Sequence, residues 1–193
     1  MKVNIFKSEN FKIRKWSGGT TTELFIWPEN SDFSQQNFDF RLSSASVETE
    51  ESEFTAFPDY MRHLSILEGE IKIMHKDKYE KILKPNDSDT FSGKWNTKSY
   101  GKAIDFNLIL KPEFKAEMEC FSLQKDEIYV LHSKPEFRFF FLFLFKGEIL
   151  MEDSENLKLS LCDYTLAEFQ SDIDIKINAK ALKKSNCVVV KIY

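Results

Sequence analysis

Short runs of apolar residues, some of them alternating with polar residues, recur along the whole chain. No window carries an apolar stripe at the 3.6-residue spacing of a helix between good capping residues. We therefore expect strands near residues 24–27, 38–47, 64–74, 104–110, 127–131, 137–145, 173–177 and 188–193. Many strands at such short spacing indicate an all-β sandwich or closed barrel rather than alternating strands and helices.

The expected strand at residues 137–145 reads FRFFFLFLF. A strand with one face in water carries apolar residues at every second position only. Here the residues from Phe139 to Phe145 are apolar at odd and even positions alike. We therefore expect this strand to be buried on both sides.

An internal repeat divides the chain. Gly-Glu-Ile occurs at residues 69–71 and again at 147–149, in the contexts ILEGEI and LFKGEI. Each copy is followed by a run that contains an Asp turn, LKPNDSDTF at 83–91 and LSLCDYTLA at 159–167. Two matched pairs in the same order favour a duplication.

The repeat predicts two units, residues 1–110 and 111–193. Lys111-Pro112 is the expected junction, although no Gly/Ser-rich linker separates the halves. Gly69 and Gly147 are expected at turns, where a positive φ or a close backbone approach favours glycine. The C-terminal unit has fewer polar residues within its strand patterns, so we expect it to be structural.

Composition and charge narrow the class of protein. The chain has 193 residues, of which 42 % are apolar, and a net charge of −4, so it can bury a core and is not disordered. It has no basic arm, and we expect no nucleic-acid partner. Its longest apolar run falls far short of the roughly 20 residues of a membrane helix, so we expect no membrane partner. We expect a soluble cytoplasmic protein, and the sequence is compatible with a homodimer.

The residues that usually carry catalysis or bind metals are sparse. The three histidines, His63, His75 and His132, form no His-x-His pair, and the three cysteines lie far apart. No Gly-x-Ser-x-Gly elbow occurs, and the glycines at 18–19 are not followed by the Gly-Lys-Ser/Thr of a phosphate loop. We expect no metal and no other cofactor.

Polar residues do occur inside strand patterns. Alternation in FDFRLSSASVE places Arg41 and Ser43 on the face opposite Phe40. Asp105 and Asn107 share a face in the same way. These residues fit the wall of a pocket, where arginine recognises anions through two parallel hydrogen bonds. Salt bridges on a solvated barrel face remain an alternative interpretation.

These segments together resemble the HutD/Ves family of cupin-like proteins. The resemblance covers about residues 16–110 and rests on several motifs in the same order. The motifs are WSGGTTTEL, FRLSSASV, the Phe-x-x-Phe-Pro segment that leads to Arg62, Leu-Glu-Gly at 67–69 and Asp-Phe-Asn-Leu at 105–108. The resemblance implies a cupin-type jelly roll, or double-stranded β-helix, duplicated as a compact bicupin.

The resemblance also implies a function. The family is linked to histidine utilisation, and its members are thought to bind a small acidic metabolite, such as a formylated or formimino amino acid, in a regulatory role without catalysis. On this basis the stretch at residues 16–24 is one wall of a pocket. The candidate ligand-binding residues are Thr20, Thr21, Glu23, Arg41, Ser43, Phe57, Arg62, His63, Asp105 and Asn107.

Two other functions remain open. One is a metal-free cupin enzyme, an isomerase or hydrolase that uses Glu23, Asp105 or His63 for acid–base chemistry. The other is a stress-response protein that acts through protein contacts. The missing nucleophile and metal signature favour binding over catalysis, and the polar strand positions favour binding over a purely structural role.

Overall fold

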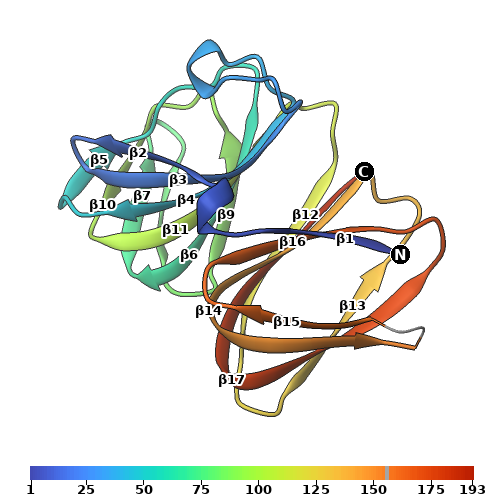
Figure 1. Ribbon diagram of the computed structural model, residues 1–193. Helices are drawn as coiled ribbons and strands as arrows, with labels where there is room; N and C mark the ends of the chain where they lie inside the picture. The colour runs from blue at the N-terminus through green and yellow to red at the C-terminus, as the bar shows by residue number, and fades with distance from the viewer. Residues whose placement is uncertain (155–156) are drawn as a thin grey trace. The chain divides into compact units, whose positions relative to one another are not determined.

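The computed structural model describes residues 1–154 and 157–193, and it is built almost wholly of strands (Figure 1). Two three-residue 3-10 helices, η1 (Ser8–Asn10) and η2 (Phe33–Gln35), complete the regular structure of these residues. None of the described residues belongs to a helix long and apolar enough to cross a membrane. The prediction of an all-β protein is confirmed.

The chain forms two compact units, residues 11–114 and residues 1–10 together with 115–193. The predicted boundary at 110/111 is therefore close to the observed one, but the assignment of residues 1–10 was wrong. Strand β1 (Lys2–Phe6) pairs antiparallel with β16 (Thr165–Gln170) and so belongs to the sheet of the C-terminal unit. No strand was predicted at residues 2–6, and a strand of five residues carries no pattern that would indicate its partner.

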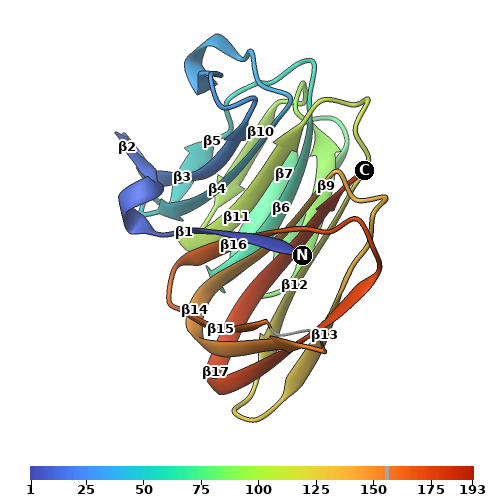
Figure 2. The same ribbon diagram turned by 45° about the vertical axis from the view of Figure 1, so that its right-hand side comes forward.

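The unit of residues 11–114 consists of two sheets. The six-stranded sheet has the order β2 (Lys12–Trp16), β3 (Gly19–Trp27), β4 (Phe40–Val47), β11 (Ala103–Leu110), β6 (Met61–Gly69) and β9 (Ser88–Ser92). The four-stranded sheet has the order β5 (Glu51–Glu53), β10 (Thr97–Tyr100), β7 (Ile71–His75) and β8 (Tyr79–Leu83). The two sheets form separate layers (Figures 1 and 2).

An apolar cluster fills the space between these two sheets. Leu64 and Ile66 of β6 pack with Ile73 of β7, Leu83 of β8 and Phe91 of β9. All five side chains are buried, and those on β6 and β7 recur at every second position. The period of two that identified these strands in the sequence is therefore the period of the core face.

The other unit has a single seven-stranded sheet built around two long strands, β14 (Phe139–Asp153) and β17 (Ile175–Ile192). The first part of β14 pairs with β16 and its second part with β15 (Lys158–Cys162). The second part of β17 pairs with β12 (Ala116–Leu123) and its first part with β13 (Ile128–Ser133). The strands predicted at 173–177 and 188–193 are thus one strand.

The two units share one strand order. In the first, the order β9-β6-β11-β4 lies in one sheet and β8-β7-β10-β5 in the other. In the second, β16-β14-β17-β12 and β15-β14-β17-β13 repeat this order. Strand β14 takes the place of both β6 and β7, and β17 takes the place of both β11 and β10. The duplication inferred from the Gly-Glu-Ile repeat is therefore present in the topology as well.

The two repeat glycines differ in their surroundings. Gly69 ends β6, as expected for a turn, and has a φ of 82°. Gly147 lies inside β14, where pairing with β17 is irregular, and has a φ of 123°. The predicted turn at Gly147 was therefore wrong, because the strand bends at a bulge and continues. A positive φ favours glycine in both settings, so the sequence pattern alone does not separate them.

The segment Phe139–Phe145 of β14 is buried at every position. Phe140, Leu142 and Leu144 belong to the apolar core of their unit. The alternate residues Phe141 and Phe143 are fully buried as well. The prediction of a strand buried on both sides is confirmed.

Candidate functional site

Two arginines lie side by side on one face of the six-stranded sheet. Ile109 of β11 pairs with Arg41 of β4 on one side and with Arg62 of β6 on the other. Residues paired across antiparallel strands project from the same face of a sheet. The strand order β4-β11-β6 therefore brings both guanidinium groups to one region.

The polar residues predicted to share a face with these arginines do so. Ser43 of β4 pairs with Asn107 of β11, and Asp105 lies two positions before Asn107 on the same face. All three side chains are buried. The period-two pattern of the sequence thus placed the polar face of both strands correctly.

These residues line a cavity of about 320 Å³ within the unit of residues 11–114. Seven of the ten predicted ligand-binding residues contribute to its wall. They are Thr21, Arg41, Ser43, Phe57, Arg62, Asp105 and Asn107.

Three predicted residues do not line the cavity. Thr20 alternates with Thr21 along β3 and so projects from the opposite face. His63 alternates with Arg62 along β6, and its Nδ1 lies 3.0 Å from Thr90 Oγ1. Burial lowers the pKa of His63 below its ordinary value. Glu23 is also outside the wall, but it contacts Arg41 directly.

Arg41 has a carboxylate of its own. Its Nε donates a hydrogen bond to Glu23 Oε2 at 2.7 Å, and its Nη1 donates to Ser43 Oγ at 2.9 Å. Burial lowers the pKa of Arg41, and the hydrogen bond that Arg41 donates to Glu23 opposes that shift. An arginine remains charged under such conditions, so this is a buried ion pair.

Arg62 has no carboxylate in direct contact among the described residues. Its Nη2 donates to Asn107 Oδ1 at 3.0 Å, and its Nη1 donates to the Thr55 backbone oxygen at 3.3 Å. Its Nε is buried and has no hydrogen-bond partner among those residues. Burial lowers the pKa of Arg62 to about 10, which still leaves the guanidinium charged at neutral pH.

Asp105 is linked to Arg62 only through Asn107. The Asn107 Nδ2 donates a hydrogen bond to Asp105 Oδ1 at 2.6 Å, while the amide oxygen of Asn107 accepts from Arg62. Burial raises the pKa of Asp105 to about 7, although the positive charge of Arg62 acts in the opposite direction. The carboxyl group is therefore close to its titration midpoint at neutral pH.

Aromatic side chains that are not among the predicted ligand-binding residues complete the cavity wall. The guanidinium of Arg41 lies 4.4 Å from the centre of the Phe33 ring, and that of Arg62 lies 4.6 Å from the centre of the Phe54 ring. Such cation–π contacts hold the guanidinium planes in place. Trp16 also lines the cavity, and its Nε1 donates to Thr21 Oγ1 at 3.2 Å. Phe33 and Phe54 lie outside the predicted strands, so no periodicity marked them.

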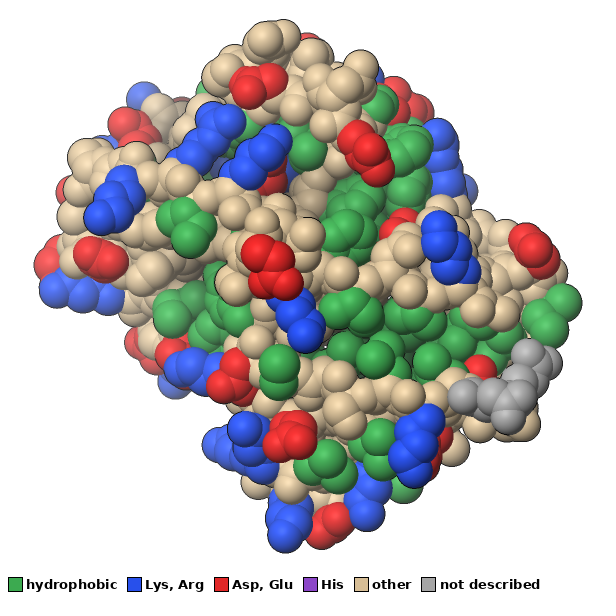
Figure 3. Space-filling model, viewed as in Figure 1, with side chains coloured by type: hydrophobic (Ala, Val, Ile, Leu, Met, Phe, Trp, Pro, Cys, Tyr) green, Lys and Arg blue, Asp and Glu red, His purple; other side chains and the backbone are tan. Residues whose placement is uncertain are grey.

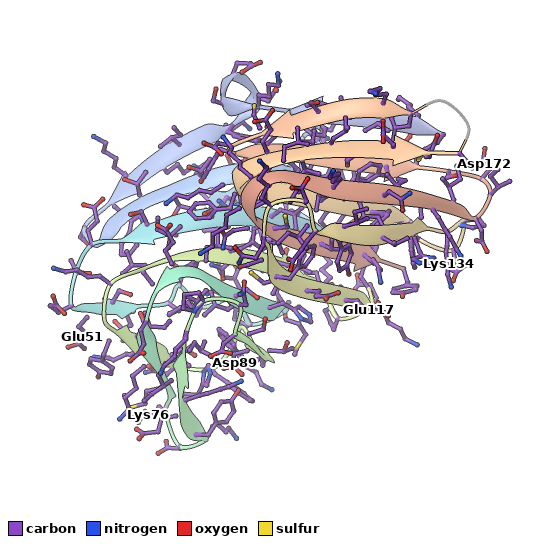
Figure 4. The ribbon with its side chains drawn as sticks, turned by 90° about the horizontal axis from the view of Figure 1, so that it is seen from below. Glu51, Lys76, Asp89, Glu117, Lys134 and Asp172 are labelled. Atoms are coloured by element: carbon purple, nitrogen blue, oxygen red, sulfur yellow. The ribbon has the colours of Figure 1, made fainter. Side chains whose placement is uncertain are left out.

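A second polar cluster, buried except for Tyr79, lies elsewhere in the same unit. The ring nitrogens of His75 lie 2.8 Å from Thr97 Oγ1 and 2.9 Å from Asp89 Oδ2, and the Tyr79 hydroxyl donates to Asp89 Oδ1 at 3.0 Å. Figure 4 labels Asp89 on β9. None of these residues lines the cavity. Their polar groups satisfy one another, which is the arrangement of a structural network.

The described residues contain no group of three or more His, Cys, Asp or Glu side chains placed to hold a metal ion. On the face shown in Figure 3, described Lys and Arg side chains are interspersed with Asp and Glu and form no continuous basic stripe. Exposed pairs such as Lys72–Glu80 and Lys98–Glu51 illustrate this mixing. The expectations of no metal and no nucleic-acid partner stay predictions.

The C-terminal unit has apolar residues where the N-terminal unit has its polar site. Phe140 precedes the repeat glycine Gly147 by the same number of residues as Arg62 precedes Gly69. Phe140 therefore takes the position of Arg62 in the second unit. The pairing of β14 with β17 then places Val189 at the position of Asn107 and Cys187 at that of Asp105. All three are buried in an apolar core. The arginine cavity therefore has no equivalent at this place in the second unit.

Solved structures with similar folds cover nearly the whole chain. A conserved protein of unknown function from Pseudomonas aeruginosa PAO1 has a TM-score of 0.83 at 19 % identity, covering 100 % of this chain and 99 % of that one. HutD from Pseudomonas fluorescens SBW25 has a TM-score of 0.77 at 18 % identity, covering 99 % and 98 %. YhhW from Escherichia coli has a TM-score of 0.74 at 12 % identity, covering 98 % and 97 %.

These similarities show the fold, which is a duplicated cupin-type jelly roll. A search of curated proteins finds no significant match. The family model described as HutD matches residues 8–187, which is most of the chain. The chain therefore belongs to the HutD family.

Proposed function

We propose that the chain is a non-catalytic binding protein that takes a small carboxylate-bearing metabolite, such as a formylated or formimino amino acid, into the cavity of residues 11–114. Its role in this proposal is regulatory, within histidine or amino-acid catabolism. The observation that carries the proposal is the Nε of Arg62, a buried guanidinium donor without a partner among the described residues.

Charge and hydrogen bonding both favour an anion here. Arg41 is matched by Glu23, whereas Arg62 is held only by neutral oxygen atoms of Asn107 and Thr55. A buried donor without a partner costs about 1–3 kcal/mol, and more when it is charged. A ligand carboxylate would satisfy the free Nε and neutralise the guanidinium in one contact.

The size and lining of the cavity fit a metabolite of amino-acid size. A volume of about 320 Å³ is near the lower end of the range for small-molecule sites. The rings of Phe33, Phe54 and Phe57 supply apolar wall, while Ser43 and Asn107 supply polar groups. The similar HutD from Pseudomonas fluorescens was solved in a formate condition, and formate is the smallest carboxylate.

An enzyme is the second candidate, and Asp105 is the observation that favours it. A buried carboxyl group with a pKa of about 7 inside a cavity is suited to acid–base catalysis. A calorimetric titration separates the two functions, because turnover gives a continuing heat signal and a product visible by NMR, whereas binding gives neither.

The test is calorimetric titration of N-formylglutamate, formiminoglutamate and urocanate into the wild type and into Arg62→Lys and Arg41→Lys. Loss of a buried charged partner costs about 2–5 kcal/mol, so Arg62→Lys should weaken binding at least about 30-fold. Lysine keeps the charge but not the planar fork, so it should not restore affinity.

Arg138→Lys is the matched control. Arg138 lies in the other unit, so this variant should bind the ligands as the wild type does. Equal binding by Arg62→Lys and the wild type would contradict the arginine cavity. If none of the three ligands binds at millimolar concentration, the ligand class is wrong, and the alternative of a protein that acts through protein contacts gains support.

A further inference from the structure

The two arginines of the cavity are paired with their carboxylates in different ways. The Oε2 of Glu23 lies 2.7 Å from the Nε of Arg41, so the charge of Arg41 is neutralised by a direct ion pair. Asp105 and Arg62 are separated by the side chain of Asn107, which accepts from one and donates to the other. Arg41 is therefore in direct contact with its carboxylate, whereas Arg62 and Asp105 contact each other only through the neutral amide of Asn107.

A ligand carboxylate on Arg62 would place a second negative charge close to Asp105. Both Asp105 and Arg62 line the same cavity, and both are buried, with exposed fractions of 5 % and 7 %. Two carboxylates in a buried site cannot both stay ionised without a large cost, and the usual outcome is that one of them takes up a proton. The ligand is held by Arg62, so Asp105 is the group that must become neutral.

Resting on the proposed function, we propose that Asp105 is the residue that makes anion binding depend on a proton, so that the ligand carboxylate enters the cavity together with one proton carried by Asp105. In its neutral form Asp105 also gains an O–H donor, which the cavity can direct at a carbonyl or carboxylate oxygen of the ligand. Asp105 thereby selects ligands that are anions and offer an acceptor.

The other charged groups around the cavity do not provide an equivalent means of balancing the charge. Arg41 on β4 is already neutralised by Glu23 on β3. Arg14 and Lys15 on β2 line the rim, where Arg14 is 43 % exposed and lies 3.6 Å from Asp32, so solvent and that carboxylate screen it.

Two further titratable side chains near the cavity, Glu53 and His63, cannot compensate the charge of a bound anion. Glu53 on β5 lines the cavity and is exposed, and it adds negative charge rather than removing it. His63 on β6 lies next to Arg62 in the sequence but projects from the opposite face, toward Thr90. Asp105 is thus the buried group in the wall that can change charge to compensate an anion.

The sign of the pH dependence follows from this arrangement. Burial already raises the pKa of Asp105 to about 7 in the empty cavity, and a bound anion raises it further. Below about pH 6 the group is protonated before the ligand arrives, so affinity does not change with pH. Above about pH 7 each binding event takes up a proton, and affinity should fall by close to tenfold per pH unit, or roughly 10- to 30-fold between pH 6.0 and pH 8.5.

The experiment uses N-formylglutamate, whose carboxyl groups are ionised over nearly all of this range, and glutarate, which is titrated at pH 8.0 only because its second carboxyl group is not fully ionised at pH 5.5. Titration calorimetry in HEPES and in Tris at pH 8.0 gives the number of protons taken up, because the two buffers have different ionisation enthalpies. The wild type should take up close to one proton per ligand at pH 8.0 and almost none at pH 5.5. Asp105→Asn should take up none at either pH, and its affinity should not vary with pH.

His63→Gln is the matched control, since it removes a neighbouring titratable side chain that does not line the cavity, and it should keep the proton uptake. In parallel, the carboxyl carbon of Asp105 in the ligand-free wild type should titrate above pH 6 by NMR. This second measurement needs no variant to fold.

Binding of either probe to the wild type at pH 8.0 without proton uptake would overturn the inference and leave the proposed function standing. Uptake that persists in Asp105→Asn, or an Asp105 signal that titrates below pH 5, would overturn it as well. If neither probe binds, the proposed function is wrong, and this inference, which rests on it, is wrong as well.

Discussion

Glu23 and Arg41 form a buried ion pair across neighbouring strands, with the Arg41 Nε 2.7 Å from Glu23 Oε2. The side chain of Glu23 is only 5 % exposed. Glu23→Gln would leave Arg41 as a buried charge without its counter-charge, and it should lower the free energy of unfolding by about 3–5 kcal/mol. Urea denaturation measures this change.

The control for this pair is Glu80→Gln. Glu80 also lies 2.7 Å from its partner, Lys72, but its side chain is 58 % exposed. An exposed pair contributes about 0–1 kcal/mol, so this variant should change stability little. Equal losses for the two variants would mean that burial does not determine the contribution of the Glu23–Arg41 pair.

A charge placed in the first part of β14 should be among the most damaging changes. Phe141 and Leu142 are both fully buried and lie on opposite faces of the strand. Phe141→Asp and Leu142→Asp should each cost several kcal/mol or abolish folding, because each buries an unpaired charge. Ile128→Asp on β13 is the control, since Ile128 is 56 % exposed and should tolerate the change. Stable folding of either β14 variant would contradict the burial of that face.

Asp105 should make the stability of the ligand-free protein fall as the pH rises. Its pKa is raised from about 4 in the unfolded chain to about 7 in the folded protein. The folded state therefore binds the extra proton, and the resulting stability is complete below about pH 4 and lost as the pH passes through about 7.

Asp105→Asn lacks this loss, so its free energy of unfolding relative to the wild type should rise by on the order of 2–4 kcal/mol between pH 4 and pH 8. Urea denaturation at several pH values measures the difference. A constant difference between variant and wild type over this range would show that Asp105 does not titrate there.

The glycine pair at the turn between β2 and β3 should respond unequally to substitution. Gly19 has a φ of 151°, and a Cβ on it would meet the backbone oxygen of Ser46. A Cβ on Gly18 would meet the ring of Trp16, a half-exposed side chain that can move. Gly19→Ala should therefore cost about 1–3 kcal/mol and Gly18→Ala less, as measured by urea denaturation. A larger loss for Gly18→Ala would reverse this assignment.

The protein should act without a bound transition metal. The sequence lacks a His-x-His pair, and the described residues hold no cluster of three or more candidate ligands. Elemental analysis of protein purified without added metal should find far less than one equivalent of iron, manganese, nickel or zinc. Near one equivalent, with ligand binding lost on chelation, would contradict this prediction.

Strand periodicity accounts for the parts of the fold and the site that the sequence predicted. Because side chains on a strand alternate strictly, the residue types around Arg41 and Asn107 were enough to place both on one polar face. The same regularity predicted the two-sided burial of Phe141. These features depend on local backbone geometry, which the sequence specifies within a few residues.

The parts that were missed depend on contacts between distant segments. Phe33 and Phe54 reach the arginines from connections between strands, where no period relates a residue to a face. His63 lies next to Arg62 on β6, so the alternation of side chains along the strand places it on the face away from the cavity. The bulge at Gly147 and the partner of β1 depend on which strands meet, and neither leaves a local pattern.

The pairing of β1 with β16 has a consequence for how the protein is made. Residues 2–6 leave the ribosome before their partner strand at residues 165–170 is synthesised. Residues 11–114 can complete their two sheets while the first strand still has exposed backbone groups. Strand β1 therefore lacks its partner until residues 165–170 have been made, and its backbone N–H and C=O groups remain open to other strands during the synthesis of the residues in between.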